Sequence, residues 1–395
     1  MIVKLKWGKM SDLCGKSVLL FGAGSLGYRA LEEMDRAGAY VVGFVDNNRS
    51  KCGEKVKGYT VYSPEDIVDF PNTKVIITST YVEEITEQLL EMRNIDFDVI
   101  QLGALRDKLL EKEFSCTFLS KNEGNDMLCQ SLASASPFFA GRLGSNELEC
   151  MAEYYYLLHR DSGGEGAYHD NLKLVMKQGA GFYPTDDLSL DRMVELYTED
   201  LKQMDFIWSM WLSRFENLLY EQFAPESAFA LYDDTAFPYN IRNPWTKILE
   251  GKKVLVIHPF EQSIQQNYKN REKLHRNKYL LPEFQLRTMK SVQSIADEMP
   301  EYNTWFEALE AMEKQIGSID FDIALIGAGA YGLPLGAYCK RIGKKAVHIG
   351  GMLQLFFGIK GKAWNKLGVY NDNWISPKTE EHPKGYQSVE AGRYW

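Results

Sequence analysis

The chain has 395 residues, of which 45% are apolar and 25% charged, a balance typical of a soluble globular protein with about two domains. Its net charge of −9, without a long run of Lys or Arg, argues against general binding to nucleic acid. No apolar stretch reaches the ~18 residues of a transmembrane helix and residues 1–9 lack a signal-peptide core, so we expect a cytoplasmic protein without a membrane span.

The succession of strand, glycine-rich turn and helix occurs twice in this sequence. An apolar run ends in G-x-G-x-x-G at Gly22, Gly24 and Gly27, and a second run ends in the same pattern at Gly327, Gly329 and Gly332. Glycines at such a turn allow a ligand to approach the backbone, and the free amides at the start of the next helix attract an anion. The two patterns predict two nucleotide-type crevices, one in each half of the chain.

Residues 1–112 have the pattern of a Rossmann-like domain that binds a nucleotide or sugar nucleotide. Apolar runs alternate with helical patterns, which predicts a small parallel sheet with right-handed crossovers. The expected strands are 17–21, 40–45, 74–79 and 97–101, and the expected helices are 25–36 and 82–93. Asp46 follows the second strand, where a Rossmann domain places an acid for ribose hydroxyls, although Asp-Asn-Asn is equally an ordinary turn.

Residues 43–66 carry a more specific signal. They resemble the N-terminal sugar-nucleotide-binding-like domain of bacterial sugar acyltransferases and of polysaccharide-modifying enzymes, in which G-F-[IV]-D-x-x is followed by G-x-x-[IV]-x-G-x-x-V. The resemblance covers about a quarter of the chain and implies a ligand related to a sugar nucleotide.

Residues 113–136 lose this periodicity and are rich in Ser, Asn and Gly. The composition predicts a linker with one short helix near 125–133. We expect limited proteolysis to cut here first, because a linker lacks the buried backbone hydrogen bonds that resist cleavage. The second domain is then residues 137–395.

A second candidate site begins where a short apolar run ends at Arg142. An arginine at a strand end binds a diphosphate through two parallel hydrogen bonds, and a carboxylate one turn later accepts a sugar hydroxyl or holds a metal. The candidate residues at this junction are Arg142, Gly144, Ser145, Asn146 and Glu147. The alternative for Glu147 is an ordinary helix-start residue that faces water.

The stretch 188–223 has many apolar and aromatic residues at helical spacing. Its Asp and Glu content argues against a helix bound to a membrane surface. We therefore expect a helical insertion that packs in the core or in a subunit contact, which leaves a homo-oligomer open.

His258 and Glu261 follow a further strand, at the carboxyl end where an open α/β sheet holds its ligand. They are candidates for an acid/base pair or for ligand contacts, with a hydrogen-bonded structural histidine as the alternative. Tyr331 lies in the second glycine turn, and Gly351 ends the last strand beside it. His348, inside that strand, is expected to be packed.

The chain from about residue 137 to its end resembles a known family. The motifs are similar to those of a group of bacterial polysaccharide-locus proteins related to the GT-D-fold glycosyltransferases, which carry an early R-[FI]-G-D-G-E motif and a late glycine-containing turn. The segments are 142–149, 254–264, 305–312, 322–351, 357–364 and 385–395. The resemblance implies a GT-D-like domain that transfers a sugar from a nucleotide-sugar donor.

One departure from the family motif concerns metal. Where the motif has Asp-x-Glu, this chain has Ser145, Asn146 and Glu147, so one carboxylate is missing and a divalent ion is in doubt. Glu149 lies two residues further and diverges from Glu147 on a helix. The six cysteines show no C-x-x-C spacing, which favours reduced thiols over a zinc site.

The sequence thus predicts two α/β domains with parallel sheets, and a glycosyltransferase acting on a carbohydrate or lipid-linked acceptor in cell-surface polysaccharide synthesis. In this hypothesis Arg142 and the second glycine turn hold the diphosphate, Glu147 binds the sugar or acts as base, and His258 and Glu261 line the acceptor side. Two alternatives remain: an NAD(P)-dependent oxidoreductase, for which no suitably placed Tyr-x-x-x-Lys is found, and a non-catalytic sugar-nucleotide-binding protein. No cofactor beyond the nucleotide-sugar substrate is predicted.

Overall fold

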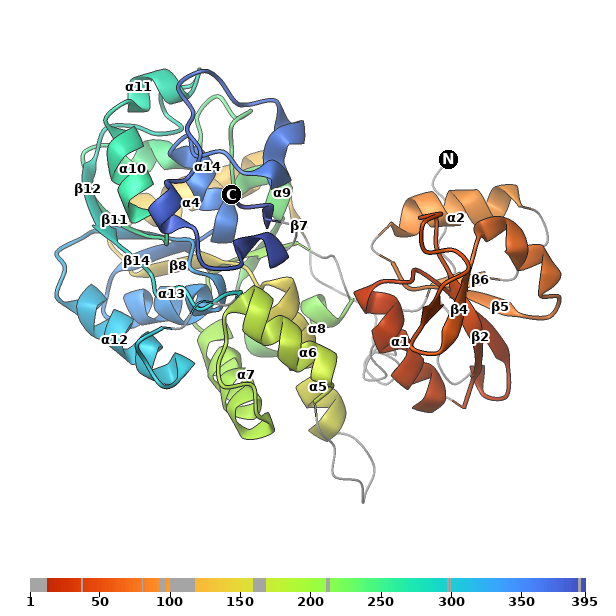
Figure 1. Ribbon diagram of the computed structural model, residues 1–395. Helices are drawn as coiled ribbons and strands as arrows, with labels where there is room; N and C mark the ends of the chain where they lie inside the picture. Colours follow the sequence, from red (N-terminus) through yellow and green to blue (C-terminus); the bar gives the residue numbers. More distant parts are fainter. Residues whose placement is uncertain are drawn as a thin grey trace. The chain divides into compact units, whose positions relative to one another are not determined.

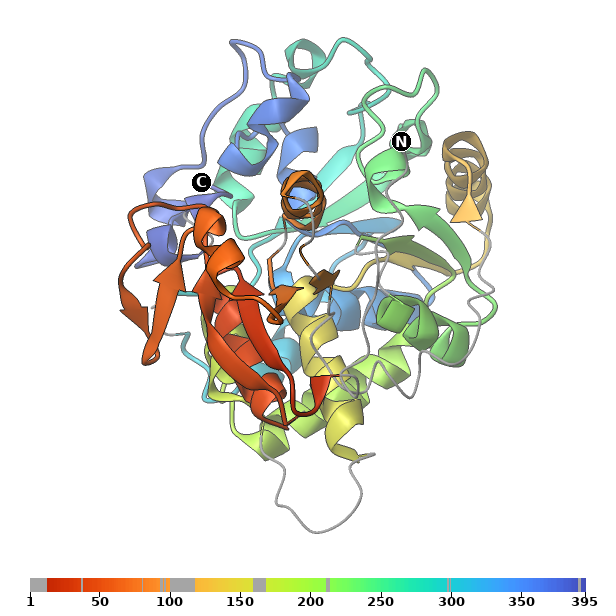
Figure 2. The ribbon, with the colours of Figure 1, turned by 90° about the vertical axis from the view of Figure 1, so that its right-hand side faces the viewer.

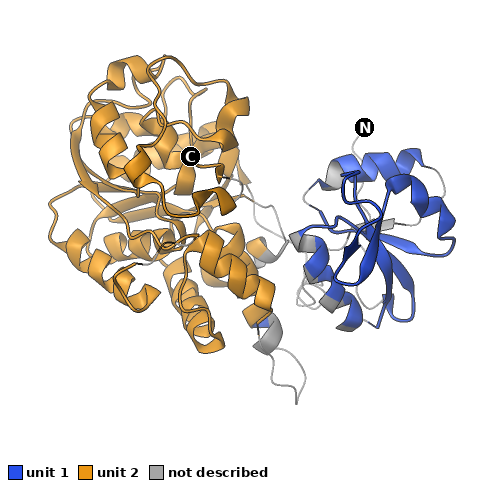
Figure 3. Ribbon diagram, viewed as in Figure 1, with its two compact units in different colours: residues 1–113, 155–162 blue, residues 114–154, 163–395 orange. Residues whose placement is uncertain are grey.

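The computed structural model describes residues 13–36, 38–79, 81–92, 95, 97–99, 118–158, 168–210, 214–296, 298, 300–389 and 392–395. The chain forms two compact units (Figure 3). Unit 1 comprises residues 1–113 and 155–162, and unit 2 comprises residues 114–154 and 163–395. Each unit has its own predominantly parallel sheet, which confirms the predicted fold class of two α/β domains.

Unit 1 contains a sheet in the order β3-β4-β2-β1-β5-β6, in which all pairs are parallel except the β3–β4 hairpin at one edge. Its strands are β1 (Ser17–Phe21), β2 (Tyr40–Val45), β3 (Lys55–Val56), β4 (Tyr59–Tyr62), β5 (Lys74–Ile77) and β6 (Phe97–Val99). Its helices are α1 (Ser25–Arg36) and α2 (Val82–Glu91), with a 3₁₀ turn at Pro64–Asp69.

The central strand β1 shows why this sheet forms. Successive side chains of a strand point to opposite faces, so a strand covered on both faces needs an unbroken apolar run. Val18 and Leu20 pack in one cluster with Ala30 of α1, and Leu19 and Phe21 pack in the other with Leu89 of α2. Both faces of β1 are therefore buried, as the sequence Ser-Val-Leu-Leu-Phe predicts.

Unit 2 contains an eight-stranded sheet in the order β12-β11-β13-β14-β8-β9-β10-β7, and every neighbouring pair is parallel. Its strands are β7 (Phe118–Leu119), β8 (Phe138–Gly141), β9 (Phe206–Ser209), β10 (Ala228–Leu231), β11 (Lys253–Ile257), β12 (Gln285–Met289), β13 (Ile323–Ile326) and β14 (Lys345–His348). A large apolar core surrounds it and includes the buried rings of Phe206, Trp208 and Trp245.

Helices cover both faces of this sheet (Figure 1). Helices α12 and α13 lie on one face, and α10 and α14 lie on the other. The helices of unit 2 are α4 (Lys121–Ala133), α5 (Ser145–Leu158), α6 (Asp170–Val175), α7 (Asp187–Leu201), α8 (Arg214–Phe223), α9 (Tyr232–Thr235), α10 (Glu261–Tyr268), α11 (Arg271–Leu274), α12 (Trp305–Gly317), α13 (Gly332–Arg341) and α14 (Leu353–Phe356). In the described part of the chain, no helix has the length and apolar character needed to cross a membrane.

The predicted linker 113–136 needs correction over its described residues. Strand β7 pairs with β10 at the sheet edge, and α4 packs beside it (Figure 2). Ser120 and Glu123 form a capping box that starts α4, which is longer than the short helix expected at 125–133. The apolar periodicity was weak because two of the four buried positions of α4 are Gly124 and Asn125, beside Leu128 and Leu132. Residues 113–117 lie outside the described residues.

Helix α4 also makes polar contacts that tie it to the rest of unit 2. The Asn125 side chain accepts a hydrogen bond from the Trp245 backbone N–H at 2.8 Å and donates one to the Asn243 carbonyl at 3.0 Å. Leu128 and Leu132 are fully or almost fully buried in the core. These contacts predict that α4 stabilises unit 2 substantially.

Two truncated proteins test this boundary. We expect a chain starting at residue 114 to fold, and a chain starting at Pro137 to be strongly destabilised, because loss of one buried leucine already costs about 2–5 kcal/mol. Thermal unfolding followed by circular dichroism measures the difference. Equal melting temperatures for the two proteins would show that α4 does not stabilise the unit.

The single helical stretch expected at 188–223 is wrong. The chain instead forms α7, then the buried strand β9, then α8. Residues 206–209 read Phe-Ile-Trp-Ser, and so short an apolar run fits a buried strand as well as a helix. The pairing of β9 with β8 and β10 stabilises residues 206–209 as a strand and not as a helix.

Candidate functional site

The sheet of unit 2 has a topological switch point between β11 and β13. From β11 the chain continues through α10 and α11 to β12, on one side, whereas from β13 it continues through α13 to β14, on the other. The two connections leave in opposite directions, so a crevice opens outside the carboxyl ends of these neighbouring strands. His258 directly follows β11, and Gly327 directly follows β13.

A pocket occupies this crevice and includes most of the site residues predicted in unit 2. The predicted residues that line it are Arg142, Gly144, Ser145, Asn146, Glu147, His258, Gly327, Gly329, Tyr331 and Gly351. They come from the ends of β8, β11, β13 and β14, which are distant in sequence and adjacent in the sheet. The structure therefore brings together the Arg142 junction, the histidine and the second glycine turn in one place.

Arg142 and Glu147 meet beside Gly144. A Cβ atom added to Gly144 would lie 2.0 Å from Glu147 Oε2 and 3.0 Å from Arg142 Nη1, so both side chains pack against the bare backbone of this residue. Glu147 is 7% exposed and lies in the first turn of α5. It does not face bulk solvent, which argues against the alternative of a water-facing helix-start residue.

The guanidinium of Arg142 also packs against Gly350, at the end of β14. A Cβ atom on Gly350 would lie 2.0 Å from Arg142 Nη2, and φ of Gly350 is +68°. Arg142 Nε is buried and has no hydrogen-bond partner among the described residues. A buried donor without an acceptor is costly in a folded protein, and a ligand oxygen at this place would supply one.

His258 is held in one neutral form. It is 2% exposed, and its Nδ1 accepts a hydrogen bond from the Phe260 backbone N–H at 3.0 Å. Burial lowers the pKa of His258 to about 3. The proton of the neutral ring is therefore on Nε2, which lies close to Gly327 at the second glycine turn. His258 is built to donate a hydrogen bond, not to accept a proton.

This tautomer gives a pH prediction. A folded-state pKa of about 3, below the 6.5 of an exposed histidine, keeps the ring neutral from about pH 5 to 8. The unfolded chain binds this proton below 6.5 and the folded chain does not, so His258 lowers stability as pH falls from about 6.5 toward 3. Long-range ¹H–¹⁵N spectra should show a protonated Nε2 without titration across pH 5–8. A midpoint near 6.5 that disappears in His258→Gln would contradict this assignment.

The glycines of the second turn have different structural roles. Gly329 has φ of +53°, and a Cβ atom there would approach only the Ala180 carbonyl, at 3.4 Å, so this glycine borders the open pocket. Gly332 does not line the pocket; a Cβ atom there would lie 2.0 Å from the ring of His348. Gly332 thus allows close helix-to-strand packing, and its role in donor binding stays a prediction. His348 is buried, as expected.

Tyr331 ends the glycine turn and is fixed on both sides. Its ring stacks on Trp305 with centroids 4.9 Å apart and planes 9° apart. Its hydroxyl lies 3.4 Å from Ser294 Oγ, which donates to the Gly181 carbonyl at 2.6 Å. Tyr331 therefore connects the glycine turn to the loops that form the opposite side of the pocket.

Glu261 is not among the residues that line this pocket. It accepts a hydrogen bond from Thr288 Oγ1 at 2.8 Å, away from His258. The N-terminus of α10 is instead occupied by Glu381, which accepts hydrogen bonds from the backbone N–H groups of Gln262 and Ser263 at 2.7 and 3.2 Å. The predicted pair of His258 and Glu261 does not form.

Several lining residues carry no local signal in the sequence. They belong to the loops 179–181 and 291–295 and to the C-terminal residues Val389, Tyr394 and Trp395. The C-terminal segment was noticed as a shared motif, but its place at the site follows from the fold alone.

Carboxylates are scarce around the pocket. Glu147 is the only one among the described residues that line it, and no group of three or more His, Cys, Asp or Glu in the described part of the chain could hold a metal ion. A hard divalent cation prefers several oxygen ligands, including carboxylates. Ser145, Asn146 and one glutamate are a poor donor set for it.

In unit 1, the first glycine turn lies at the switch point between β1 and β5. A Cβ atom on Gly27 would lie 1.9 Å from the Gly22 carbonyl, and one on Gly22 would lie 2.6 Å from the Thr78 carbonyl. These two glycines are required by packing. Gly24 has no atom within 4 Å of such a Cβ, so it alone borders open space. Nucleotide binding at this turn stays a prediction.

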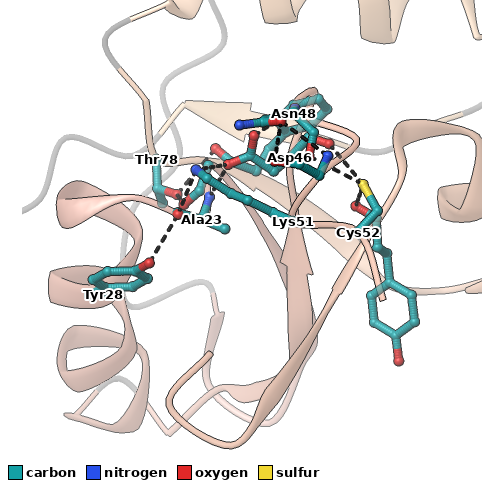
Figure 4. Close-up of polar contacts among 11 residues, drawn as sticks. Ala23, Tyr28, Asp46, Asn48, Lys51, Cys52 and Thr78 are labelled. Atoms are coloured by element: carbon teal, nitrogen blue, oxygen red, sulfur yellow. Dashed lines mark hydrogen bonds and ion pairs between the residues drawn. The ribbon is translucent and has the colours of Figure 1, made fainter. Parts of the chain in front are cut away.

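Asp46 already has partners within unit 1 (Figure 4). Its Oδ2 accepts from the Ala23 N–H at 3.0 Å and from Lys51 Nζ at 2.9 Å, and its Oδ1 accepts from the Asn48 N–H at 2.8 Å. Burial acts to raise the pKa of Asp46, but these hydrogen bonds outweigh it and hold the pKa below its usual range. The contact with Asn48 is that of an Asx turn, so a ribose hydroxyl would compete with Lys51 for this carboxylate.

The family-model comparison concerns unit 1 and not the pocket. Residues 15–100 match the family model described as C2185-like, N-terminal. Among solved structures, UDP-D-quinovosamine 4-dehydrogenase from Vibrio fischeri matches at 26% identity over 21% of this chain and 75% of that chain, with a TM-score of 0.18. In the comparison with curated proteins, none matches this chain. The family match ends before residue 101, outside the pocket of unit 2.

Proposed function

We propose that unit 2 binds a nucleotide sugar in the switch-point pocket and transfers the sugar to a carbohydrate or lipid-linked hydroxyl. The observation that carries this proposal is the convergence of Arg142, the second glycine turn and the fixed Nε2–H of His258 at one crevice. All three suit an acceptor-rich anion such as a diphosphate. The resemblance of the C-terminal motifs to GT-D-fold glycosyltransferases supports the same reaction class.

The chemistry requires a leaving group to be stabilised. The bond between sugar C1 and the diphosphate oxygen breaks, and the negative charge that develops on the nucleoside diphosphate is met by the guanidinium of Arg142 and the N–H of His258. Charge stabilisation of this kind is usually the largest contribution an enzyme makes. The donors are held before the ligand arrives, because Gly144, Gly350 and Phe260 fix them.

A proton must also leave the acceptor hydroxyl as its oxygen bonds to sugar C1. His258 has its proton on Nε2 and a low pKa, so it does not take this proton. Among the described residues that line the pocket, Glu147 is the carboxylate to which we assign that task. In this proposal Glu147 is the base, Arg142 and His258 bind the diphosphate, and no metal is assigned a step.

Two measurements test the proposed function. Saturation-transfer NMR with UDP-, GDP- and CMP-sugars and with NAD(P) should show binding of a nucleotide sugar that competes with inorganic pyrophosphate. Release of nucleoside diphosphate in the presence of oligosaccharide or glycolipid acceptors should then be lost in Glu147→Gln, which keeps the size of the side chain, while binding persists. Binding without any release in the unmodified protein would favour the non-catalytic alternative, and hydride transfer from NAD(P)H would favour the oxidoreductase.

A further inference from the structure

The C-terminal residues form one side of the pocket in unit 2. Tyr394 and Trp395 line it together with Val389. Their rings make an edge-to-face pair, with centroids 5.9 Å apart and planes at 89°. Phe260, which also lines the pocket, contacts Trp395 with centroids 6.1 Å apart. We call Phe260, Tyr394 and Trp395 the aromatic wall.

Several contacts hold the aromatic wall in place. Gln354 Nε2 donates to the Tyr394 carbonyl at 3.1 Å, and the Ala363 N–H donates to the Arg393 carbonyl at 2.9 Å. Glu381, earlier in the same segment, caps α10. The wall is therefore pre-formed, which spares a ligand the cost of ordering it.

Two successive glycines separate the aromatic wall from the anion-binding side. Gly350 packs against the Arg142 guanidinium, and Gly351 packs against Tyr394, whose Cε1 would lie 2.8 Å from an added Cβ. A charged group and an aromatic ring thus lie on neighbouring residues of one turn. A ligand spanning both needs an anionic part joined directly to a part with an apolar face.

We propose that the aromatic wall binds the sugar ring of the donor, so that the pocket recognises a hexose joined to a phosphate. A pyranose ring has C–H groups on its faces that pack on an aromatic surface, and hydroxyls at its edge that need polar partners. Trp395 is 9% exposed as a residue, and its buried indole Nε1 has no hydrogen-bond partner among the described residues. It offers such a partner to a hydroxyl. The perpendicular rings form a corner, which suits a puckered ring better than the parallel slot that holds a flat base.

This inference rests on the proposed function. Small ligands that carry only one part of a nucleotide sugar test the sugar assignment separately from the proposed function. Inorganic phosphate and pyrophosphate test the anion side alone. Glucose 1-phosphate, galactose 1-phosphate and mannose 1-phosphate test both sides together, and UMP, GMP and CMP test a base. Calorimetry should show that at least one hexose 1-phosphate binds about tenfold or more tightly than inorganic phosphate, the gain typical of one well-placed aromatic contact.

Substitutions test whether the aromatic wall causes the tighter binding of the hexose 1-phosphate. Trp395→Ala should remove most of the tenfold preference and leave pyrophosphate affinity unchanged, and Trp395→Phe should retain part of it. Gly351→Ala should act like Trp395→Ala, because it displaces Tyr394 without touching Arg142. Thermal unfolding monitors folding of each variant. Quenching of Trp395 fluorescence by the sugar phosphate, absent in Trp395→Phe, is an independent readout.

The outcomes differ for the two proposals. Equal losses for pyrophosphate and hexose 1-phosphate in Trp395→Ala would make the wall structural and overturn the sugar assignment. Two further outcomes would overturn the sugar assignment while leaving the anion site intact. One is pyrophosphate binding without preference for any hexose 1-phosphate. The other is preference for a nucleoside monophosphate that Trp395→Ala removes. Absence of pyrophosphate, nucleotide and sugar-phosphate binding would overturn the proposed function itself.

Discussion

Replacing Arg142 by alanine is expected to lower the rate of sugar transfer by about 10²–10³-fold, the effect of removing one pre-organised donor from a developing negative charge. Its guanidinium lies between Gly144 and Gly350 in the pocket, and Nε has no acceptor among the described residues. In the proposed reaction, Arg142 supplies much of the positive charge that the leaving diphosphate meets. The measurement is release of nucleoside diphosphate under saturating donor.

Controls for this variant separate charge from geometry. Arg142→Lys keeps the charge but loses the two parallel donors, so we expect an intermediate rate. Arg287→Ala removes an exposed arginine on β12 and should leave the rate unchanged. EDTA should have a smaller effect than Arg142→Ala, because Glu147 is the one carboxylate among the described residues that line the pocket. Complete loss of activity in EDTA with recovery in Mn²⁺ would contradict this account and require a carboxylate beyond Glu147.

Gly329→Val is expected to remove most of the affinity for the donor, at least about tenfold. Gly329 borders the pocket, and its amide lies at the turn where a phosphate would approach the backbone. A valine there fills that space. Calorimetry with pyrophosphate and with the bound nucleotide sugar measures the loss.

A matched variant distinguishes loss of space from backbone strain. Gly329 has φ of +53°, so a side chain there costs about 1–2 kcal/mol for the left-handed backbone alone. Gly343, after α13, has φ of +79° and no atom within 4 Å of an added Cβ, and it lies outside the pocket. Gly343→Val should therefore lose similar stability and keep full affinity. Unchanged binding in a folded Gly329→Val protein would remove this turn from the site.

Much of unit 1 follows from its local sequence. The bounds of β1, β2 and α1 agree with the prediction, because a strand buried on both faces needs a continuous apolar run and a following helix begins at a glycine turn. The short hairpin of β3 and β4 was not predicted. Two-residue and four-residue strands at a sheet edge bury little and leave a weak pattern.

In unit 2 the local pattern was sufficient for some elements and ambiguous for others. Strands β11 and β13 were predicted where they occur, since each is an apolar run followed directly by histidine or glycine, whereas β14 ends at His348 and not at the predicted Gly351. Strand β9 was read as helix, and α4 was read mostly as linker. Short apolar runs, and helices whose buried face includes glycine or polar residues, become unambiguous only when their partners, such as β8 for β9 and Trp245 for α4, are in place.

In the candidate site, too, some features follow from the local sequence and others only from the tertiary structure. The sequence by itself placed Arg142, His258 and the second glycine turn at carboxyl ends of strands, and parallel strands bring those ends to one edge of a sheet. The tertiary structure alone decided the order of the strands and therefore which ends are neighbours. It also decided that Glu261 faces Thr288, that Phe260 fixes the His258 tautomer, and that Trp395 reaches the pocket. These contacts join residues through packing and burial, which depend on the whole core and leave no pattern in any single stretch of chain.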